Sequence, residues 1–269
     1  MKKIFVSILI ANYNKKKYIS RCLKSLENQT YKNFEVIFFD DKSTDNSVQQ
    51  VKKFSNKLNI KLIVNNKKKK NIAAFDQMNS YYQSFRHANG KILLFLDSDD
   101  FFEKMKIMKV VSYFNDNKQK QILFDLPIIF FTKKKKKIIS FKKRISLASM
   151  WPQFPPQSCI SLRSKVFKKI FSNIFNKKFP NISLDFRIAV YSYFISKDFN
   201  IANNYLTYYF QDIQGESRNF LYFSKNWWLR RLEAHRYLRY FFQKNNIRYI
   251  YGIDFFLTSI ICLFWNIKI

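Results

Sequence analysis

Short runs of consecutive apolar residues alternate with helical patterns through the first hundred residues, and this alternation constrains the fold more than any other feature. These runs, which are mostly apolar, are Phe5–Ala11, Phe34–Phe39, Ile60–Val64 and Ile92–Leu96. Strands that are apolar throughout are buried on both faces, which is typical of parallel sheets covered by helices. The repeated order of strand and helix favours the same arrangement. The sequence therefore predicts an α/β fold, with a mostly parallel sheet and helices on both of its faces.

The segments between these runs have the spacing of amphipathic helices. The first helix has its apolar face at Ile19, Cys22, Leu23 and Leu26. A second helix is predicted from about Asn46, with inward residues Val48, Val51 and Leu58, and a third over the stretch from Ala73 to about Ala88. The second half predicts a strand over Gln121–Phe131, a proline-rich loop over Trp151–Pro156, and helices over Val166–Ile174, from about Asp185, and after Phe220.

The chain is strongly basic, since 49 Lys and Arg residues against 18 Asp and Glu residues give a formal net charge of +31. A charge of this size attracts polyanions, among them nucleic acids and anionic membranes. Much of it lies in two lysine runs, Lys67–Lys70 and Lys133–Lys137, which lack the interleaved aromatic residues that stack on bases. Solvated lysine faces or attraction to an anionic membrane surface therefore explain the charge better than nucleic acid does.

Composition also excludes several kinds of site. The chain contains 3 Gly, 3 Cys and 2 His. So few glycines exclude a glycine-rich dinucleotide-binding loop, and the scattered cysteines form no disulfide framework. Two histidines disfavour a structural zinc site. We therefore expect a protein of a reducing compartment, which is the cytoplasm.

Both ends of the chain have apolar segments that resemble membrane signals. The run Phe5–Ala11 is followed by Asn12-Tyr13-Asn14 rather than by a cleavage site, so we interpret it as the first strand. Residues 249–265 are strongly apolar but are interrupted by Asp254, and the stretch beyond Asp254 is too short to cross a bilayer. Two interpretations stay open: a helix docked on the domain, or an interfacial membrane anchor beside Arg230, Arg231, Arg236 and Arg239.

Acidic residues gather after two of the predicted strands. Six of the 18 lie there: Asp40, Asp41 and Asp45 after the second strand, and Asp97, Asp99 and Asp100 after the fourth. Ligands of open parallel sheets bind outside the carboxyl ends of the strands. Crowded carboxylates repel one another unless a cation lies among them, and oxygen ligands suit Mg²⁺ or Mn²⁺. The sequence therefore predicts a divalent ion that binds a diphosphate at this edge. The alternative is that some of these acids cap helices, since Asp45 and Asp100 stand where a following helix would need a cap. We accept this alternative for Asp45 but not for Asp99.

The strand-end motifs occur in an order that resembles one known family. They read Ser7-Ile8-Leu9-Ile10-Ala11-Asn12-Tyr13-Asn14, then Gln29-Thr30-Tyr31 with Asn33-Phe34-Glu35-Val36, then Asp40-Asp41 with Ser43-Thr44-Asp45, then Phe95-Leu96-Asp97-Ser98-Asp99-Asp100. Together they resemble the family 2 glycosyltransferases of GT-A fold. The resemblance implies a Rossmann-like domain with a nucleotide-sugar-binding half over residues 1–105, an acceptor-binding half over 106–220, and a basic, aromatic helical extension over 221–269.

The resemblance also implies roles for individual residues near the donor. Tyr13 would stack on the nucleotide base, and Asp41 would bond its edge, with Asp40 close by. Asp97 and Asp99 form the D-x-D-type element of the family. Asp97 would face the ribose or the donor sugar, and Asp99 would hold the Mg²⁺ or Mn²⁺ that bridges the diphosphate. A bound divalent ion neutralises the charge that develops on a departing nucleoside diphosphate.

An inverting transferase of this family needs a general base for the acceptor hydroxyl. The resemblance implies Asp185, in Ser183-Leu184-Asp185-Phe186-Arg187 at the start of a predicted helix. The alternative is that Asp185 only stabilises the helix N-terminus. Asp212 and Glu216 are the other candidates for the base, and Arg218 is a candidate contact for the diphosphate. Cys159 is expected to be buried rather than nucleophilic.

Two departures from the family pattern leave the donor open. Lys42 and Asn46 stand where glycine is common, and residues 67–87, which normally shape the donor pocket, are divergent. We expect a metal-dependent inverting glycosyltransferase that moves a hexose from a nucleotide-sugar, with UDP as the expected nucleotide. The expected acceptor is a saccharide or lipid-linked saccharide in surface glycan, lipopolysaccharide or capsule synthesis, reached from the inner face of the cell membrane. The alternative is a catalytically silent nucleotide- or glycan-binding module.

Overall fold

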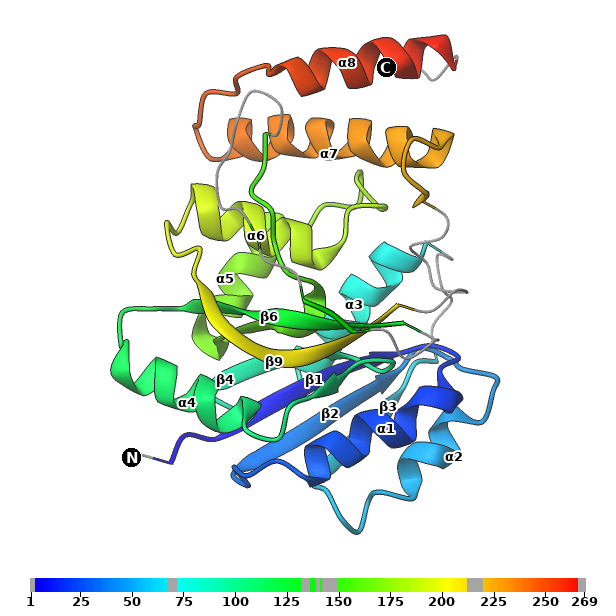
Figure 1. The fold of residues 1–269 in the computed structure, drawn as a ribbon, viewed down its shortest axis with the longest axis vertical. Helices are drawn as coiled ribbons and strands as arrows, with labels where there is room; N and C mark the ends of the chain where they lie inside the picture. The colour runs from blue at the N-terminus through cyan, green and yellow to red at the C-terminus, as the bar shows by residue number, and fades with distance from the viewer. Residues whose placement is uncertain are drawn as a thin grey trace.

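The four apolar runs form four adjacent parallel strands, as the sequence predicts. The computed structural model describes residues 3–66, 72–131, 136–138, 141, 150–211 and 220–265. The parallel strands are β1 (Val6–Asn12), β2 (Phe34–Asp40), β3 (Ile60–Val64) and β4 (Ile92–Asp97), in the spatial order β3-β2-β1-β4. Their carboxyl ends therefore lie side by side at one edge of the sheet (Figure 1).

The sheet continues beyond β4 through strands from the second half of the chain. The predicted strand is β6 (Ile122–Phe131), and it is joined to β4 by the antiparallel strand β8 (Ile160–Arg163). On its other side, β6 pairs in parallel with β9 (Ile201–Gln211), which reaches the two-residue strand β5 (Phe101–Phe102). A short strand, β7 (Lys136–Ile138), also pairs with β6. The sequence did not predict β8 or β9, and their pairings make this half of the sheet mixed rather than parallel.

Three helices cover one face of the parallel strands: α1 (Lys16–Glu27), α2 (Ser47–Lys52) and α4 (Lys106–Asp116) (Figure 1). The predicted apolar face of α1 is fully buried against Val6, Ile8 and Ile10 of β1. The second helix is shorter than predicted, because α2 ends before Leu58, which is nevertheless buried in the turns after the helix.

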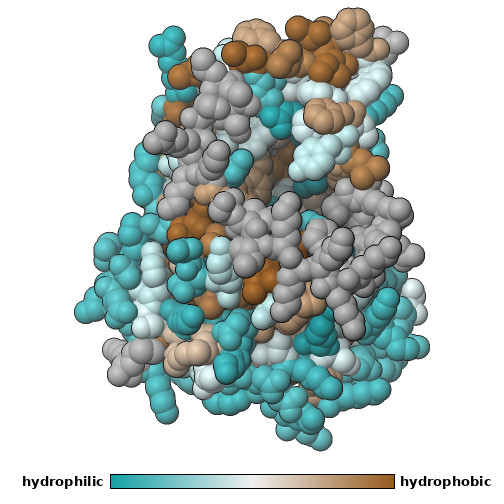
Figure 2. Space-filling view, viewed as in Figure 1, coloured by the Kyte–Doolittle hydropathy of each residue, from teal (hydrophilic) through white to brown (hydrophobic). Residues whose placement is uncertain are grey.

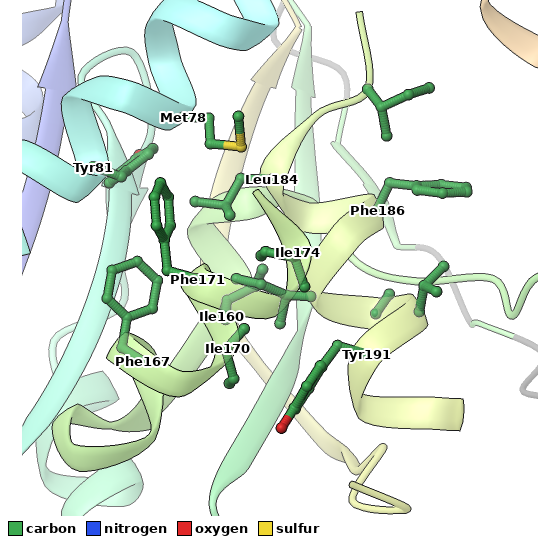
Figure 3. Packing of buried hydrophobic residues seen from close by; sticks show 14 of the residues in the cluster. Met78, Tyr81, Ile160, Phe167, Ile170, Phe171, Ile174, Leu184, Phe186 and Tyr191 are labelled. Carbon is green, nitrogen blue, oxygen red and sulfur yellow. The ribbon is translucent and has the colours of Figure 1, made fainter. Parts of the chain in front are cut away.

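Three other helices cover the opposite face: α3 (Ala73–Phe85), α5 (Ser164–Ile174) and α6 (Leu184–Phe194). Leu9 of β1 and Phe95 of β4 point to this side and share a core with Met78, Phe167 and Leu184 from the three helices. Figure 3 shows how closely these helical side chains pack. Helices therefore cover both faces of the sheet, which confirms the predicted fold class.

Two further helices form the outer layers of the molecule: α7 (Lys225–Lys244) and α8 (Ile253–Phe264). The inner side of α7 packs on the core formed by α3, α5 and α6, through Tyr237, Leu238 and Phe241. The helix α8 lies on the far side of α7 from the sheet (Figure 1). Among the described residues, no helix combines the length and the apolar character needed to cross a membrane.

A buried ion pair joins α4 to the second half of the sheet. Lys106 Nζ lies 2.8 Å from Asp125 Oδ2 on β6, and both side chains are excluded from solvent. The same ammonium group donates to Thr207 Oγ1 on β9 at 2.6 Å and to the carbonyl oxygen of Ser158 at 2.7 Å. A single buried cation therefore fixes three separate segments relative to one another.

Candidate active site

The register of β1 with its two neighbours brings three loops to one edge of the sheet. Asn12 pairs with Asp40 on β2, and Ala11 pairs with Asp97 on β4. The chain leaves all three strands at these positions. The acidic residues that the sequence singles out therefore converge on the two sides of the loop after β1.

Asp40 holds the loop after β2 in shape. Its side chain is fully buried, and its oxygens accept hydrogen bonds from Asn12 Nδ2 at 2.7 Å and from the backbone N–H of Ser43 at 2.8 Å. Lys42 in this turn has a φ of 63°, the left-handed conformation that usually favours glycine. Asp40, which we expected close to the nucleotide, therefore shapes the loop and offers no exposed surface to a ligand.

Asp41 and Tyr13 follow the ends of the neighbouring strands β2 and β1, and Asp41 is buried. Asp41 Oδ1 accepts a hydrogen bond from Asn65 Nδ2 at 2.6 Å, and the backbone N–H of Asp41 donates to the carbonyl oxygen of Asn12 at 2.8 Å. Tyr13, the residue after Asn12, is 51% exposed. A fixed carboxylate and an accessible aromatic ring thus occur on two neighbouring loops.

Asp45 belongs to the helices rather than to the site. Its Oδ2 accepts a hydrogen bond from the backbone N–H of Lys16, the first residue of α1, at 2.8 Å. Its Oδ1 accepts from the backbone N–H of Ser47, the first residue of α2, at 3.1 Å. The carboxylate therefore satisfies a free N–H at the start of two helices, which confirms its predicted capping role.

Asp97 and Asp100, which flank the loop after β4, are both engaged in hydrogen bonds. Asp97 Oδ1 accepts from Gln77 Nε2 at 2.8 Å and from the hydroxyl of Tyr81 at 2.6 Å, and both donors are on α3. Asp100 is fully buried, and its Oδ1 accepts from the backbone N–H of Phe210 on β9 at 2.8 Å. Asp100 therefore ties the loop to β9 and does not cap a helix.

Asp99, between them, contacts cationic groups. Its side chain is 20% exposed, and its Oδ2 lies 2.7 Å from Lys15 Nζ. Its carbonyl oxygen accepts a hydrogen bond from Arg21 Nη2 at 2.8 Å. An accessible carboxylate that already attracts a cation fits Mg²⁺ or Mn²⁺, which take most of their remaining ligands from phosphates and water. In the described part of the chain, no group of three or more His, Cys, Asp or Glu side chains is arranged to hold a metal ion by itself.

Burial and mutual repulsion raise the pKa values of the acids in this loop. Burial and the charge of Asp99 raise the pKa of Asp97 to about 7. Burial and the same neighbouring carboxylates raise the pKa of Asp100 well above its usual range. Burial followed by the charges of these acids also raises the pKa of the Tyr209 hydroxyl. The loop therefore concentrates negative charge that a bound cation would stabilise.

Asp185 reaches the same region from the second half of the chain. It lies in the first turn of α6, where its Oδ1 accepts a hydrogen bond from the backbone N–H of Phe186 at 2.7 Å. Burial raises the pKa of Asp185, whereas the charge of Arg230 on α7 lowers it. Arg230 Nη2 also donates to Ser183 Oγ, just before α6, at 3.3 Å. Asp185 is close enough to Asp97 to raise the pKa of that residue.

Of the other residues that the sequence singles out in the second half of the chain, the structure describes Cys159. Asp212, Glu216 and Arg218 lie outside the described residues. Cys159 is fully buried, as predicted, and burial raises the pKa of its thiol, which disfavours the reactive thiolate.

Several residues of the site were missed by the sequence argument. Lys15 comes directly after the Asn12-Tyr13-Asn14 motif. A search for basic as well as acidic residues after the predicted strands would therefore have found Lys15. Tyr81 and Gln77 lie four residues apart on α3, but nothing in that spacing indicates a carboxylate partner. Tyr209 lies on β9, a strand that the sequence did not predict.

More than half of the chain matches one known protein family. Residues 7–171, which include the loops after β1, β2 and β4, match the family described as Glycosyl transferase family 2. The chain belongs to glycosyl transferase family 2. This is the family that the motifs at the strand ends resemble.

Curated family 2 relatives are similar over part of the chain. An uncharacterized glycosyltransferase of Nostoc sp. is 30% identical over 177 residues, which are 62% of this chain and 53% of that protein. The poly(ribitol-phosphate) beta-N-acetylglucosaminyltransferase TarS of Staphylococcus aureus is 31% identical over 128 residues, which are 45% of this chain and 20% of TarS. The UDP-Glc:alpha-D-GlcNAc-diphosphoundecaprenol beta-1,3-glucosyltransferase WfgD of Escherichia coli is 35% identical over 112 residues, which are 42% of each chain. The chain thus spans about half the length of these relatives, or less.

Solved structures of similar fold extend the likeness to most of the chain. The structure of S. aureus TarS 1–349 in complex with UDP-GlcNAc has a TM-score of 0.58 at 21% identity and covers 92% of this chain and 68% of that one. The mannosyltransferase PcManGT from Pyrobaculum calidifontis, in complex with GDP-Man and Mn²⁺, has a TM-score of 0.53 at 14% identity and covers 89% and 63%. At these identities the likeness shows the fold, which is the predicted GT-A fold.

Proposed function

We propose that this family 2 glycosyltransferase transfers a hexose from a nucleotide-sugar to a saccharide hydroxyl, with inversion at the anomeric carbon. The observation that supports the proposal is the strand register, which places Asp41 and Tyr13 beside Asp97 and Asp99, together with the electrostatic effect of Asp185 on Asp97. Residues for a nucleotide, a diphosphate and an acceptor are thus available at one edge, contributed by both halves of the chain.

The donor would lie across the carboxyl ends of β2, β1 and β4. Tyr13 offers a ring face to the nucleotide base, and Asp41 offers a carboxylate to its polar edge, while Asp40 keeps the loop in position. Asp97 would face the ribose or the sugar, and Asp99 would hold Mg²⁺ or Mn²⁺. When bound, such an ion would stabilise the negative charge of the departing diphosphate. UDP is the nucleotide we propose, because TarS structures hold UDP and UDP-GlcNAc and WfgD is named for UDP-Glc.

Asp185 is the proposed general base. Its raised pKa improves its basicity, while Arg230 favours the ionised form that can accept a proton. The carboxylate would take the proton of the acceptor hydroxyl as that oxygen attacks the anomeric carbon. The bond from this carbon to the diphosphate breaks on the opposite face, and the nucleoside diphosphate leaves. Surface glycans and their lipid-linked precursors are the acceptors we propose, since TarS and WfgD are named for such polymers and precursors.

The test measures nucleoside diphosphate release from a panel of nucleotide-sugars, with Mn²⁺ or Mg²⁺ present and a saccharide acceptor added. Chelation of the divalent ion should abolish release, and its return should restore it. Asp99→Ala should lower turnover by about 10²–10³-fold, as expected when a principal electrostatic stabiliser is lost. Activity that is unchanged by chelator would contradict the role of Asp99.

Asp185→Asn separates the base from the donor site. Turnover should fall by about 10²–10⁴-fold, the usual contribution of a general base, while nucleotide affinity stays near that of the wild type. Asp116→Asn is the matched control, because Asp116 is an exposed carboxylate at the end of α4. Nucleotide binding without turnover in the wild-type protein would instead indicate a silent binding module.

A further inference from the structure

The helix α8 has its polar and apolar sides reversed relative to an ordinary surface helix. The side chains that it buries against the protein are Asp254, Thr258 and Cys262, spaced four residues apart. The side chains that are at least 50% exposed are Ile253, Phe256, Leu257, Ile260, Leu263 and Phe264. A helix between a protein core and water normally has the opposite arrangement. The outer side of α8 is therefore suited to an apolar environment.

Specific polar contacts fix this orientation. Asp254 Oδ1 accepts from Arg231 Nε at 2.7 Å and lies 2.6 Å from Arg231 Nη2 on α7. Asp254 Oδ2 lies 3.2 Å from His235 Nε2, and Cys262 Sγ lies 3.6 Å from the carbonyl oxygen of Trp228. Contacts near both ends of α8 therefore prevent the helix from turning its apolar side inward.

The apolar surface extends beyond α8 onto the segment just before α7. Figure 2 shows hydrophobic residues gathered along α8 at the top of the molecule. Leu221, Tyr222 and Phe223, just before α7, are 62–81% exposed, and Phe223 packs on Trp228, the residue that α8 contacts through Cys262. Contiguous apolar surfaces of this kind mark interaction sites.

The charge of the unit formed by residues 220–265, which contains α7 and α8, indicates the kind of partner that this surface binds. Its exposed basic residues are Lys225, Arg236, Arg239, Lys244 and Arg248. The acidic residues of the sequence from 220 to 265 are Glu233 and Asp254, and both bind within the protein: Glu233 to Asn181 and Asp254 to Arg231. Two copies of so basic a surface would repel each other, whereas an anionic lipid surface offers both acyl chains and phosphate groups.

We propose that α8 and the segment 221–223 before α7 bind the surface of an anionic phospholipid bilayer. The outer side chains of α8 enter the boundary between headgroups and acyl chains, and the basic residues of the helix pair contact lipid phosphates. The binding is peripheral, and it does not depend on the proposed sugar transfer.

Vesicle flotation with the full chain tests this proposal. The wild-type protein should float with vesicles of phosphatidylcholine and phosphatidylglycerol but not with phosphatidylcholine alone. Phe256→Asn combined with Ile260→Asn should weaken the partition to anionic vesicles by at least about ten-fold. Val64→Asn is the matched control, because Val64 is 51% exposed on β3, outside this unit, and it should bind like the wild type. Thermal unfolding of the double variant, expected at the wild-type temperature, verifies its fold.

Three results would overturn the proposal. The first is a wild-type protein that does not float with anionic vesicles. The second is a folded double variant that floats as well as the wild type, which would assign the binding to lysine-rich surfaces elsewhere. The third is a wild-type dimer that the double substitution converts to a monomer without any vesicle binding, which would assign the surface to a second copy of the chain.

Discussion

Asp97 is the residue at which the requirements of folding and of catalysis conflict most directly. Its carboxylate is partly buried beside Asp99, and its pKa is raised to about 7. In the unfolded chain an aspartate ionises near a pH of about 3.9. The folded state therefore binds the proton more tightly, and the contribution of Asp97 to stability falls as the pH rises from about 4 to about 7. Ionised Asp97 at neutral pH makes the free protein less stable than it could be.

Asp97→Asn should consequently stabilise the unliganded protein at pH 8 while removing activity. The amide oxygen can still accept the hydrogen bonds from Gln77 and Tyr81, both of which go to one oxygen of the carboxylate. We expect the free energy of unfolding to rise by about 1 kcal/mol at pH 8, with the gain disappearing near pH 4. Denaturant unfolding at both pH values measures the effect. A variant less stable than the wild type at pH 8 would show that Lys15 already offsets the repulsion.

At the scale of elements, prediction succeeded where a segment carries its own signal. β1, β2 and β4 are mostly apolar because both of their faces are buried, and α1 and α5 have complete apolar stripes, whereas the short edge strand β3 is only partly buried. β9 has no such signal, since polar residues such as Asn203 and Asn204 interrupt it and its strand structure depends on pairing with β6, about 80 residues away in sequence. The parallel strands were therefore predictable, whereas in the mixed half β6 was predicted and its neighbours β8 and β9 were not.

The candidate site divides in the same way. Carboxylates at strand ends could be found from the sequence because parallel strands bring their ends together. The different roles of Asp40 and Asp41 could not, since both are buried: Asp40 binds Asn12 and the backbone of Ser43, whereas Asp41 binds Asn65. Arg230 was also beyond sequence analysis, because its link to Asp185 depends on how α7 packs beside α6.

The buried pair Lys106–Asp125 connects elements that the sequence analysis treated separately. Lys106→Met should destabilise the protein by about 3–5 kcal/mol, because it leaves a carboxylate buried without its cation. Burial already raises the pKa of Asp125, and the ammonium group of Lys106 opposes that rise. Without Lys106 the pKa rises further, so the loss of stability should be larger at pH 8 than at pH 5. Denaturant unfolding at the two pH values measures it.

A double variant provides the control for this prediction. Lys106→Met combined with Asp125→Leu removes both charges and leaves Thr207 with the carbonyl oxygen of Ser158 as a neighbour at 3.3 Å. Much of the lost stability should return, and the difference between pH 5 and pH 8 should disappear. If the single and double variants unfold alike at both pH values, the ion pair is not what joins these segments.

At the scale of the whole molecule, α7 connects the proposed membrane surface to the proposed active site. Its inner side packs on the core through Leu238, its outer side binds α8 through Arg231, and its Arg230 contacts the turn that precedes Asp185. A protein bound to lipid through α8 would therefore hold its proposed general base on the neighbouring layer, in a fixed orientation relative to the bilayer. This arrangement suits an acceptor that is itself attached to lipid.

Arg230→Gln tests the connection between α7 and the active site. The charge of Arg230 lowers the pKa of Asp185 against the raising effect of burial. Removing the charge should raise that pKa, so the base would become protonated at a higher pH. We expect the acidic limb of the pH profile of kcat to move upward, with activity reduced most at low pH and recovered at high pH. Nucleoside diphosphate release measured across the pH range gives the profile.

The matched control is Arg239→Gln, which removes an exposed charge from the same helix, where it acts on Tyr249 rather than on Asp185. Its pH profile should coincide with that of the wild type, even though the loss of a basic residue weakens binding to anionic vesicles. If the role of Arg230 were only structural, its loss would lower activity equally at every pH. A displaced α6 would not return to its place as the pH rises. Only an electrostatic effect on Asp185 produces a loss that alkaline pH reverses, and an unshifted limb in Arg230→Gln would therefore separate α7 from the catalytic base.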